Sequence, residues 1–123
     1  MTGLKILAID DSRTMRNLLR VTLEEAGHRV YTANDGEEGV QAAQREVPDV
    51  VITDINMPKL DGFGVISALR QSGAARHMPI LVLSTESGSA LKDRARQGGA
   101  TGWIVKPFDD AQLLAAIRRV AGY

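Results

Sequence analysis

Short apolar segments alternate with longer amphipathic segments along the chain. The apolar segments predict five β-strands, at Leu4–Ile9, Arg29–Ala33, Val50–Thr53, Ile80–Ser84 and Gly102–Val105. Four of them are rich in Val, Ile or Leu and alternate little, which is typical of strands covered on both faces. The segment Arg29–Ala33 alternates more, as an edge strand does. The pattern therefore predicts one sheet that is buried on both sides.

Helical periodicity fills the intervals between these strands. The first helix has Met15, Leu18, Leu19, Thr22 and Leu23 at helical spacing, after Ser12 as N-cap and before Gly27 as a stop. The other four helices are expected at about Glu37–Glu46 after Asp35 as cap, from after Asp61 to near Gly73, at about Ala90–Gln97, and from near Asp109, where Gln112 gives a capping-box spacing. This regular alternation predicts an α/β fold, (βα)₅, with a parallel sheet and helices on both faces.

Composition and charge narrow the class of protein. The 123 residues are 44% hydrophobic and 24% charged, which predicts one globular domain over residues 1–123. There is no cysteine, and fifteen basic residues balance fifteen acidic ones. A neutral chain lacks the basic field of a nucleic-acid binder, and no apolar run approaches the roughly 18 residues of a membrane span. We therefore expect a cytoplasmic monomer with neither membrane insertion nor direct nucleic-acid binding.

The residues that follow the strands carry the candidate chemistry. Asp10 and Asp11 follow the first strand and Asp54 the third, while Ser84 ends the fourth and Lys106 follows the fifth. In an open parallel sheet, ligands bind outside the carboxyl ends of the strands. Three carboxylates, a hydroxyl and an ammonium group are therefore expected to meet at one edge.

Such a cluster has a chemical rationale. Carboxylates packed together repel one another unless a cation compensates, and Mg²⁺ prefers a few carboxylate oxygens together with water and phosphate. Beside the metal, Asp54 could attack phosphorus and form an aspartyl phosphate, with Lys106 and Ser84 binding phosphoryl oxygens. Taken singly, each residue has an ordinary alternative, such as a solvated turn, a helix cap or a surface lysine. Their convergence on one edge favours the chemical interpretation.

The motifs resemble the receiver domain of two-component response regulators over essentially the whole chain. They are the acidic pair after the first strand, the sequence D-x-N-M-P-x-x-D-G from Asp54, the Ser-Thr pair after the fourth strand, and K-P-F from Lys106. The resemblance implies a flavodoxin-like fold with strand order 2-1-3-4-5. It also implies a signalling protein that is no enzyme beyond its own phosphorylation and dephosphorylation.

The same resemblance implies a role for each site residue. Asp54 would be the phosphoacceptor, and Mg²⁺ would be held by Asp10, Asp11, Asp54 and the backbone carbonyl of Asn56. Ser84 and Lys106 would contact the phosphoryl group, with a cis bond between Lys106 and Pro107. Trp103 would be the switch aromatic, where chemotaxis members usually carry tyrosine; a plain core tryptophan is the alternative.

The resemblance also implies partners. A histidine kinase would donate the phosphoryl group, and the face formed by the fourth helix, fifth strand and fifth helix would bind a protein target. That face is expected to carry Lys92, Arg94, Arg96, Arg118 and Arg119. No effector domain is expected, and the chemotaxis-type motifs favour the flagellar motor switch as target. The alternatives are a phosphate sink, a phosphorelay intermediate and a kinase regulator.

Two other functional classes fit the residues less well. A phosphohydrolase of the haloacid dehalogenase type would need a second aspartate two residues after the nucleophile, where this chain has Asn56. A flavin carrier would need a hydroxyl-rich phosphate loop after the first strand, where Asp10 and Asp11 would repel the phosphate of FMN.

Overall fold

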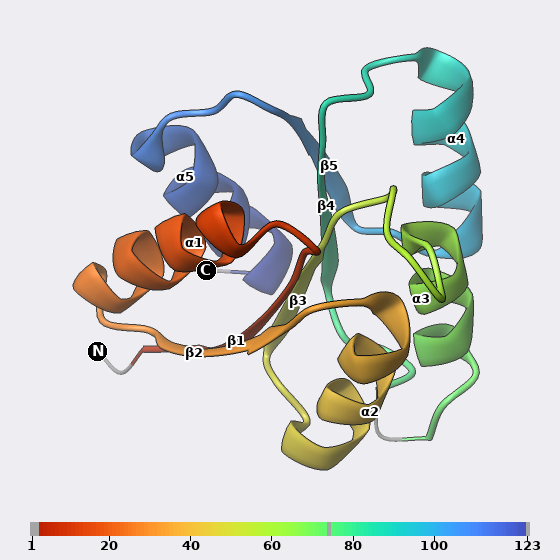
Figure 1. Cartoon of the computed structure of the whole chain (residues 1–123), viewed down its shortest axis with the longest axis horizontal. Helices are drawn as coiled ribbons and strands as arrows, with labels where there is room; N and C mark the ends of the chain where they lie inside the picture. The colour runs from red at the N-terminus through yellow and green to blue at the C-terminus, as the bar shows by residue number, and fades with distance from the viewer. Residues whose placement is uncertain (1–2, 74, 123) are drawn as a thin grey trace.

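The computed structural model describes residues 3–73 and 75–122, so the outermost residues of the predicted domain, 1–2 and 123, lie outside the described part. Five strands alternate with five helices along the chain (Figure 1). In chain order they are β1 Lys5–Ile9, α1 Arg13–Glu25, β2 Arg29–Ala33, α2 Gly36–Glu46, β3 Val50–Thr53, α3 Gly62–Arg70, β4 Ile80–Ser84, α4 Ser89–Gly98, β5 Gly102–Val105 and α5 Asp110–Ala121.

The five strands form one parallel sheet in the order β2-β1-β3-β4-β5. This confirms the predicted flavodoxin-like (βα)₅ fold. The central strands β1, β3 and β4 are almost fully buried, whereas the edge strands β2 and β5 are partly exposed. The alternating pattern of Arg29–Ala33 therefore identified an edge strand correctly.

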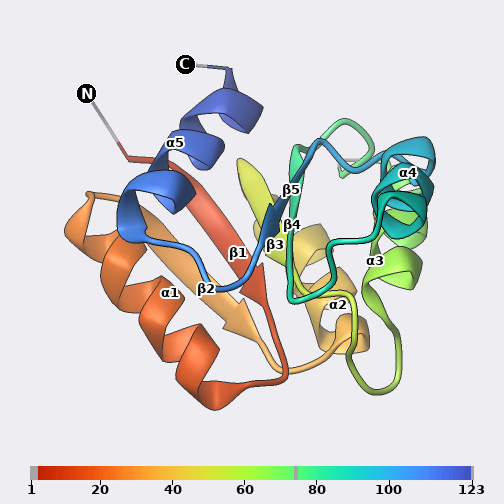
Figure 2. The same cartoon turned by 90° about the horizontal axis from the view of Figure 1, so that it is seen from above.

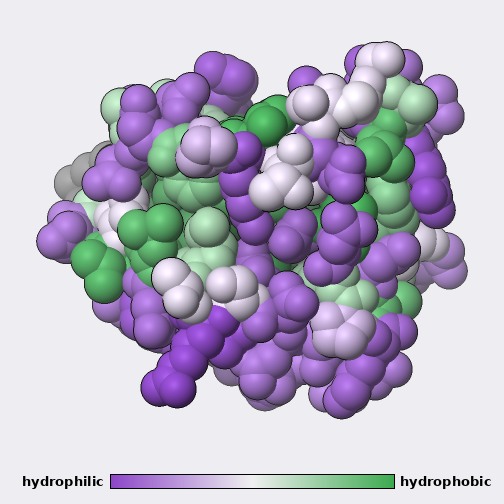
Figure 3. Space-filling model, turned by 45° about the horizontal axis from the view of Figure 1, so that its top comes forward, coloured by the Kyte–Doolittle hydropathy of each residue, from purple (hydrophilic) through white to green (hydrophobic). Residues whose placement is uncertain are grey.

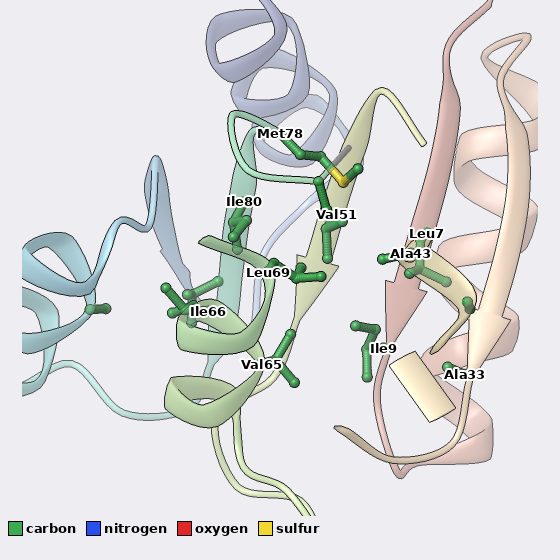
Figure 4. Close-up of a cluster of buried hydrophobic side chains, with 14 of the residues drawn as sticks. Leu7, Ile9, Ala33, Ala43, Val51, Val65, Ile66, Leu69, Met78 and Ile80 are labelled. Carbon is green, nitrogen blue, oxygen red and sulfur yellow. The ribbon is translucent and has the colours of Figure 1, made fainter. Parts of the chain in front are cut away.

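Helices cover both faces of the sheet. Figures 1 and 2 show α1 and α5 on one face and α2, α3 and α4 on the other. Strand β1 illustrates the division, because Leu7 and Ile9 pack toward α2 and α3 while Ile6 and Ala8 pack toward α1 and α5. Figure 4 shows the apolar cluster that contains Leu7 and Ile9, where the α3 side chains lie against β3 and β4. Two apolar layers thus hold the sheet rigidly between helices.

Side-chain caps set the beginnings of four helices. The side chains of Ser12, Asp35, Asp61 and Asp109 each accept a hydrogen bond from a backbone N–H in the first turn of the following helix. Asp109 and Gln112 form the expected capping box. Helix α4 differs, because its N-cap is Gly88 and no side chain caps it. Its only fully buried residue is Ala95, so α4 is held less firmly than the other helices.

The opposite end of α4 is fastened by Arg70. From the last turn of α3, this guanidinium donates to the carbonyl of Gly99 at 2.6 and 3.0 Å. It also donates to the carbonyls of Arg76 at 3.0 Å and Met78 at 2.5 Å. One side chain therefore ties α3, the segment before β4 and the C-terminal end of α4 together.

One sequence-based expectation about helix faces differs from the structure. Leu18 was expected on the inner face of the first helix, but it is 45% exposed. The apolar stripe is narrower than predicted, because Leu19, Thr22 and Leu23 already fill the contact with the sheet.

Within the described ranges, no helix is long and apolar enough to cross a lipid bilayer.

His28 joins the residues just before β1 and β2 by a hydrogen bond, and the pH dependence of stability tests that contact. Its Nδ1 accepts a hydrogen bond from the Leu4 backbone N–H at 3.0 Å, which requires a neutral ring. Burial lowers the pKa of His28 below its ordinary value of 6.5. The unfolded chain therefore binds the proton more readily, and the free energy of unfolding falls as the pH drops through 6.5 toward the lowered pKa.

We expect His28→Asn, which keeps an acceptor but cannot titrate, to remove this part of the pH dependence. Between about pH 7.5 and about pH 5.5, wild type should lose about 0.5 kcal/mol more stability than the variant, a small value because solvent screens the partly exposed ring. Urea unfolding of both proteins at the two pH values measures the difference. Identical losses would contradict the role of His28.

Candidate functional site

The parallel sheet brings the predicted residues to one edge. All strands run in the same direction, so their carboxyl ends lie together (Figure 2). Asp10 follows β1, and Asp54 follows β3, which is the strand next to β1 in the sheet. Ser84 ends β4, and Lys106 follows β5 at the edge. The sheet order therefore places an acidic half of the site beside a half that carries the hydroxyl and the ammonium group.

Three carboxylates form a compact cluster. Asp10, Asp11 and Asp54 each offer one oxygen, and these oxygens all lie within 4.8 Å of one another. Asp10 is only 2% exposed, Asp54 is partly buried and Asp11 is exposed. The cluster thus has a buried wall and an open side. Like charges at this spacing repel, so the site needs compensating cations.

Lys106 supplies one of these cations. Its Nζ lies 3.0 Å from Asp10 Oδ2 and 3.2 Å from Asp54 Oδ2, and its side chain is 13% exposed. Burial alone would lower the pKa of Lys106, but the hydrogen bonds and negative charges of Asp10 and Asp54 outweigh it and raise that pKa above its ordinary value. The ammonium group therefore stays charged and bridges the two carboxylates. The Lys106–Pro107 bond is cis, as the resemblance implied.

Backbone groups fix the acceptor candidate and its neighbour. Asp54 Oδ1 accepts the Ile55 N–H at 2.7 Å, which leaves Oδ2 facing Lys106. Asp10 Oδ1 accepts the Ser12 N–H at 2.9 Å. Helix α3 begins so close to Asp54 that a Cβ on Gly62 would lie 2.4 Å from the Asp54 carbonyl oxygen. Only glycine therefore allows this approach.

The donor set fits a hard divalent cation. Carboxylate oxygens with room for water and a phosphate ligand are the environment that Mg²⁺ prefers. Asn56 is exposed in the loop after Asp54, and in the described part of the chain its carbonyl accepts no hydrogen bond. Asp10, Asp11, Asp54 and that carbonyl could thus hold the ion, while Lys106 contacts the cluster from the side of β5.

A hydrogen-bonded path links the site to Trp103. Ser84 is fully buried, and its Oγ accepts the Glu86 N–H at 3.1 Å. The carbonyl of the same Glu86 accepts the Trp103 indole N–H at 3.0 Å. The backbone of Glu86 therefore lies between the hydroxyl at the site and the aromatic ring on β5. The sequence indicated Ser84 and Trp103 as switch residues, but not that the backbone of Glu86 joins them.

Trp103 is partly buried and lies between surface hollows. One hollow of about 210 Å³ is lined by Lys92, Arg96 and the edge of β5, and another of about 300 Å³ is lined by Arg119 and α5. Arg118 is exposed on α5. The expectation that Arg94 belongs to this face was wrong, because its guanidinium stacks 3.9 Å from the ring centre of Phe63 on α3.

One contact near the cluster was not anticipated. The Arg16 side chain donates from Nη1 to the Asp10 carbonyl at 2.8 Å. The sequence assigned Arg16 no role in the site, although it stands one helical turn beyond the cap Ser12.

Figure 3 shows that hydrophilic side chains cover much of one side of the molecule, while apolar ones form small separate patches.

Removing the Lys106 charge tests the balance of the cluster. We expect Lys106→Met to lower the free energy of unfolding by about 2–3 kcal/mol in Mg²⁺-free buffer, because it leaves the buried Asp10 carboxylate without its cation. Urea unfolding measures the loss. Adding Asp10→Asn should recover more than half of it, while Lys92→Met, at an exposed lysine of α4, should change stability by less than about 0.5 kcal/mol. A Lys106→Met protein as stable as wild type would contradict this account.

Comparison with known proteins agrees with this geometry. The model of the response regulator receiver domain matches residues 6–118. The structure of the chemotaxis protein CheY4 of Vibrio cholerae is 42% identical, covers 98% of this chain and 99% of its own, and superposes with a TM-score of 0.92. Protein PilG of Pseudomonas aeruginosa is 34% identical over 116 residues, which are 94% of this chain and 86% of PilG.

A further solved structure bears on the metal. The receiver domain of a sensor histidine kinase from Pseudomonas aeruginosa has a magnesium ion coordinated in its active-site cleft. It is 27% identical, covers 99% of this chain and 100% of its own, and has a TM-score of 0.91. Several curated relatives are longer, and the chain spans about half of their length, from 44% to 47% for three that are 40% identical. The sheet, the acidic edge and these matches together show that the chain belongs to the response regulator receiver domain family, whose members are signalling proteins.

Proposed function

We propose that the protein is a phosphoacceptor switch of a two-component system, phosphorylated on Asp54. The observation that carries this proposal is the contact of Lys106 with Asp54 and Asp10 inside a cluster of three carboxylates. Burying an ammonium group and packing carboxylates together both cost free energy of folding. A site that binds a phosphoryl group explains this cost, because the ammonium group can bind the negative phosphoryl oxygens. The donor would be the phosphohistidine of a histidine kinase.

The transfer requires little covalent chemistry from the protein. A carboxylate oxygen of Asp54 attacks phosphorus, the new O–P bond forms as the N–P bond to the kinase imidazole breaks, and the imidazole takes up a proton. The ammonium group of Lys106 exchanges its contact with the Asp54 oxygen for a contact with a phosphoryl oxygen. Asp10, Asp11, Asp54 and the Asn56 carbonyl would hold Mg²⁺, which would neutralise charge on the phosphoryl oxygens. Loss of the phosphoryl group to water, within the same site, resets the switch.

The conformational change after phosphorylation would pass through the two backbone hydrogen bonds of Glu86. To donate to a phosphoryl oxygen, Ser84 must turn, and the Glu86 N–H that its Oγ accepts must find a new partner. Because the Glu86 carbonyl accepts from Trp103, movement of this loop releases or re-aims the indole. The uncapped N-terminal end of α4 follows the loop, so the α4-β5-α5 face changes shape. Phosphorylation thus shifts a two-state equilibrium at the surface.

The target that this face fits best is a protein with an acidic segment. Lys92, Arg96 and Arg119 surround the hollows beside Trp103. The likeness to CheY4 favours a chemotaxis role, with the flagellar motor switch as partner of a monomeric, cytoplasmic protein. A phosphate sink, a phosphorelay intermediate or a kinase regulator would use the same site, and they remain the alternatives for the target.

Asp54→Asn tests the acceptor. We expect the variant to lose labelling by acetyl phosphate in Mg²⁺ completely, because an amide is no nucleophile toward phosphorus. Intact-protein mass spectrometry detects the added phosphoryl group. Asp93→Asn, which removes an exposed carboxylate on α4, should be labelled like wild type. Labelling of the Asp54 variant at the wild-type level would overturn the assignment.

Binding to the flagellar motor switch tests the target. The protein activated with beryllofluoride, a phosphoryl mimic, should bind purified switch protein at least tenfold more tightly than the untreated protein. The Asp54→Asn protein, which lacks the oxygen that holds the mimic, is the control and should show no gain. An activated protein that accepts phosphate but ignores the switch protein would exclude the motor role and leave the alternatives.

A further inference from the structure

We propose that Arg16 is a positioning residue for the acidic cluster, which it organises through the peptide bond between Asp10 and Asp11. This inference rests on the proposed Mg²⁺ site and concerns a residue that is not among the proposed metal ligands. Its basis is the hydrogen bond from Arg16 Nη1 to the Asp10 carbonyl oxygen at 2.8 Å. A charged donor makes this bond stronger than one between neutral groups.

The oxygen that Arg16 binds lies at a sensitive point. It belongs to the peptide that joins the two aspartates, so a rotation of that peptide would redirect both side chains. Arg16 itself is fixed, because its backbone N–H donates to the Ser12 carbonyl at 2.9 Å in the first turn of α1. Helix α1 therefore reaches back through one side chain and holds the turn from which it begins.

The two carboxylates depend on this peptide to different degrees. Asp10 has two further supports, the Ser12 N–H on Oδ1 and the Lys106 ammonium on Oδ2. Asp11 is exposed, and none of the described residues donates a hydrogen bond to its carboxylate. Only the backbone therefore restricts where its side chain starts, and the carboxylate itself has no further support. Mg²⁺ demands a nearly ideal octahedron, so a loosely directed ligand costs affinity.

Arg16 also brings a positive charge close to the site, and this effect has the opposite sign. Removing a charge several ångströms from a bound cation, in contact with solvent, should tighten Mg²⁺ binding by about twofold to fivefold. Loss of a residue that orients a ligand typically weakens metal binding by about 10- to 100-fold. The direction of the change therefore distinguishes positioning from simple charge repulsion.

Arg20 provides a matched control on the same helix. It stands one turn further along α1 and donates to the Val30 carbonyl and to Thr32 Oγ1, both at 3.3 Å. Like Arg16, it fastens α1 to a neighbouring segment, but its contacts lie on β2 and on Glu24 of its own helix, and not on the acidic turn. Its removal reproduces the loss of one arginine from α1 without touching Asp10.

The experiment measures Mg²⁺ affinity by isothermal titration calorimetry on wild type and on Arg16→Met, Arg16→Lys, Arg20→Met and Asp11→Asn. We expect Arg16→Met to bind about tenfold more weakly, near the lower limit for an orienting residue because the lost charge partly offsets the effect. Arg16→Lys, which can still donate to the Asp10 carbonyl, should recover most of the affinity. Arg20→Met should stay within about twofold of wild type.

The outcomes separate this inference from the function on which it rests. Unchanged or tighter Mg²⁺ binding by Arg16→Met, with weakened binding by Asp11→Asn, would overturn the role of Arg16 and leave the metal site intact. Equal weakening by Arg16→Met and Arg20→Met would also overturn it, because the effect would then come from helix α1 as a whole. Equal affinity of wild type and Asp11→Asn would overturn the metal site, and this inference with it.

Discussion

The crowding of three carboxylates at the end of a buried sheet is the constraint on which the rest of the site depends. Asp10 has almost no access to water, so its charge must be balanced by groups of the protein. Lys106 balances it from β5, and Arg16 supports it from α1. Residues from both ends of the chain thus meet at one aspartate, and the sheet order β2-β1-β3-β4-β5 brings them there.

Much of this arrangement could be predicted because it depends on backbone topology. Apolar runs place strands, caps such as Ser12 and Asp109 place helix beginnings, and a parallel sheet brings the ends of its strands together. Asp10, Asp54 and Lys106 therefore met where the sequence predicted. Their roles in phosphoryl transfer stay proposals, since the geometry supplies only their proximity.

The remainder depends on where long side chains turn, which sequence spacing does not determine. Arg94 was expected beside Trp103 but stacks on Phe63, because the ring of α3 offers a flat surface to its guanidinium. The contact of Arg16 with the Asp10 carbonyl and that of Trp103 with the Glu86 carbonyl are bonds to backbone oxygens. Such acceptors occur at every residue, so no pattern of residue types singles them out.

The indole on β5 has a consequence beyond signalling. Trp103 is the only tryptophan of the chain, and its N–H donates to the carbonyl of a loop residue that also contacts Ser84. Indole emission responds to hydrogen bonding and to water, and here it arises from one defined position. The protein therefore carries its own optical probe of the loop, which needs neither a dye nor an engineered label and reports on the native side chain.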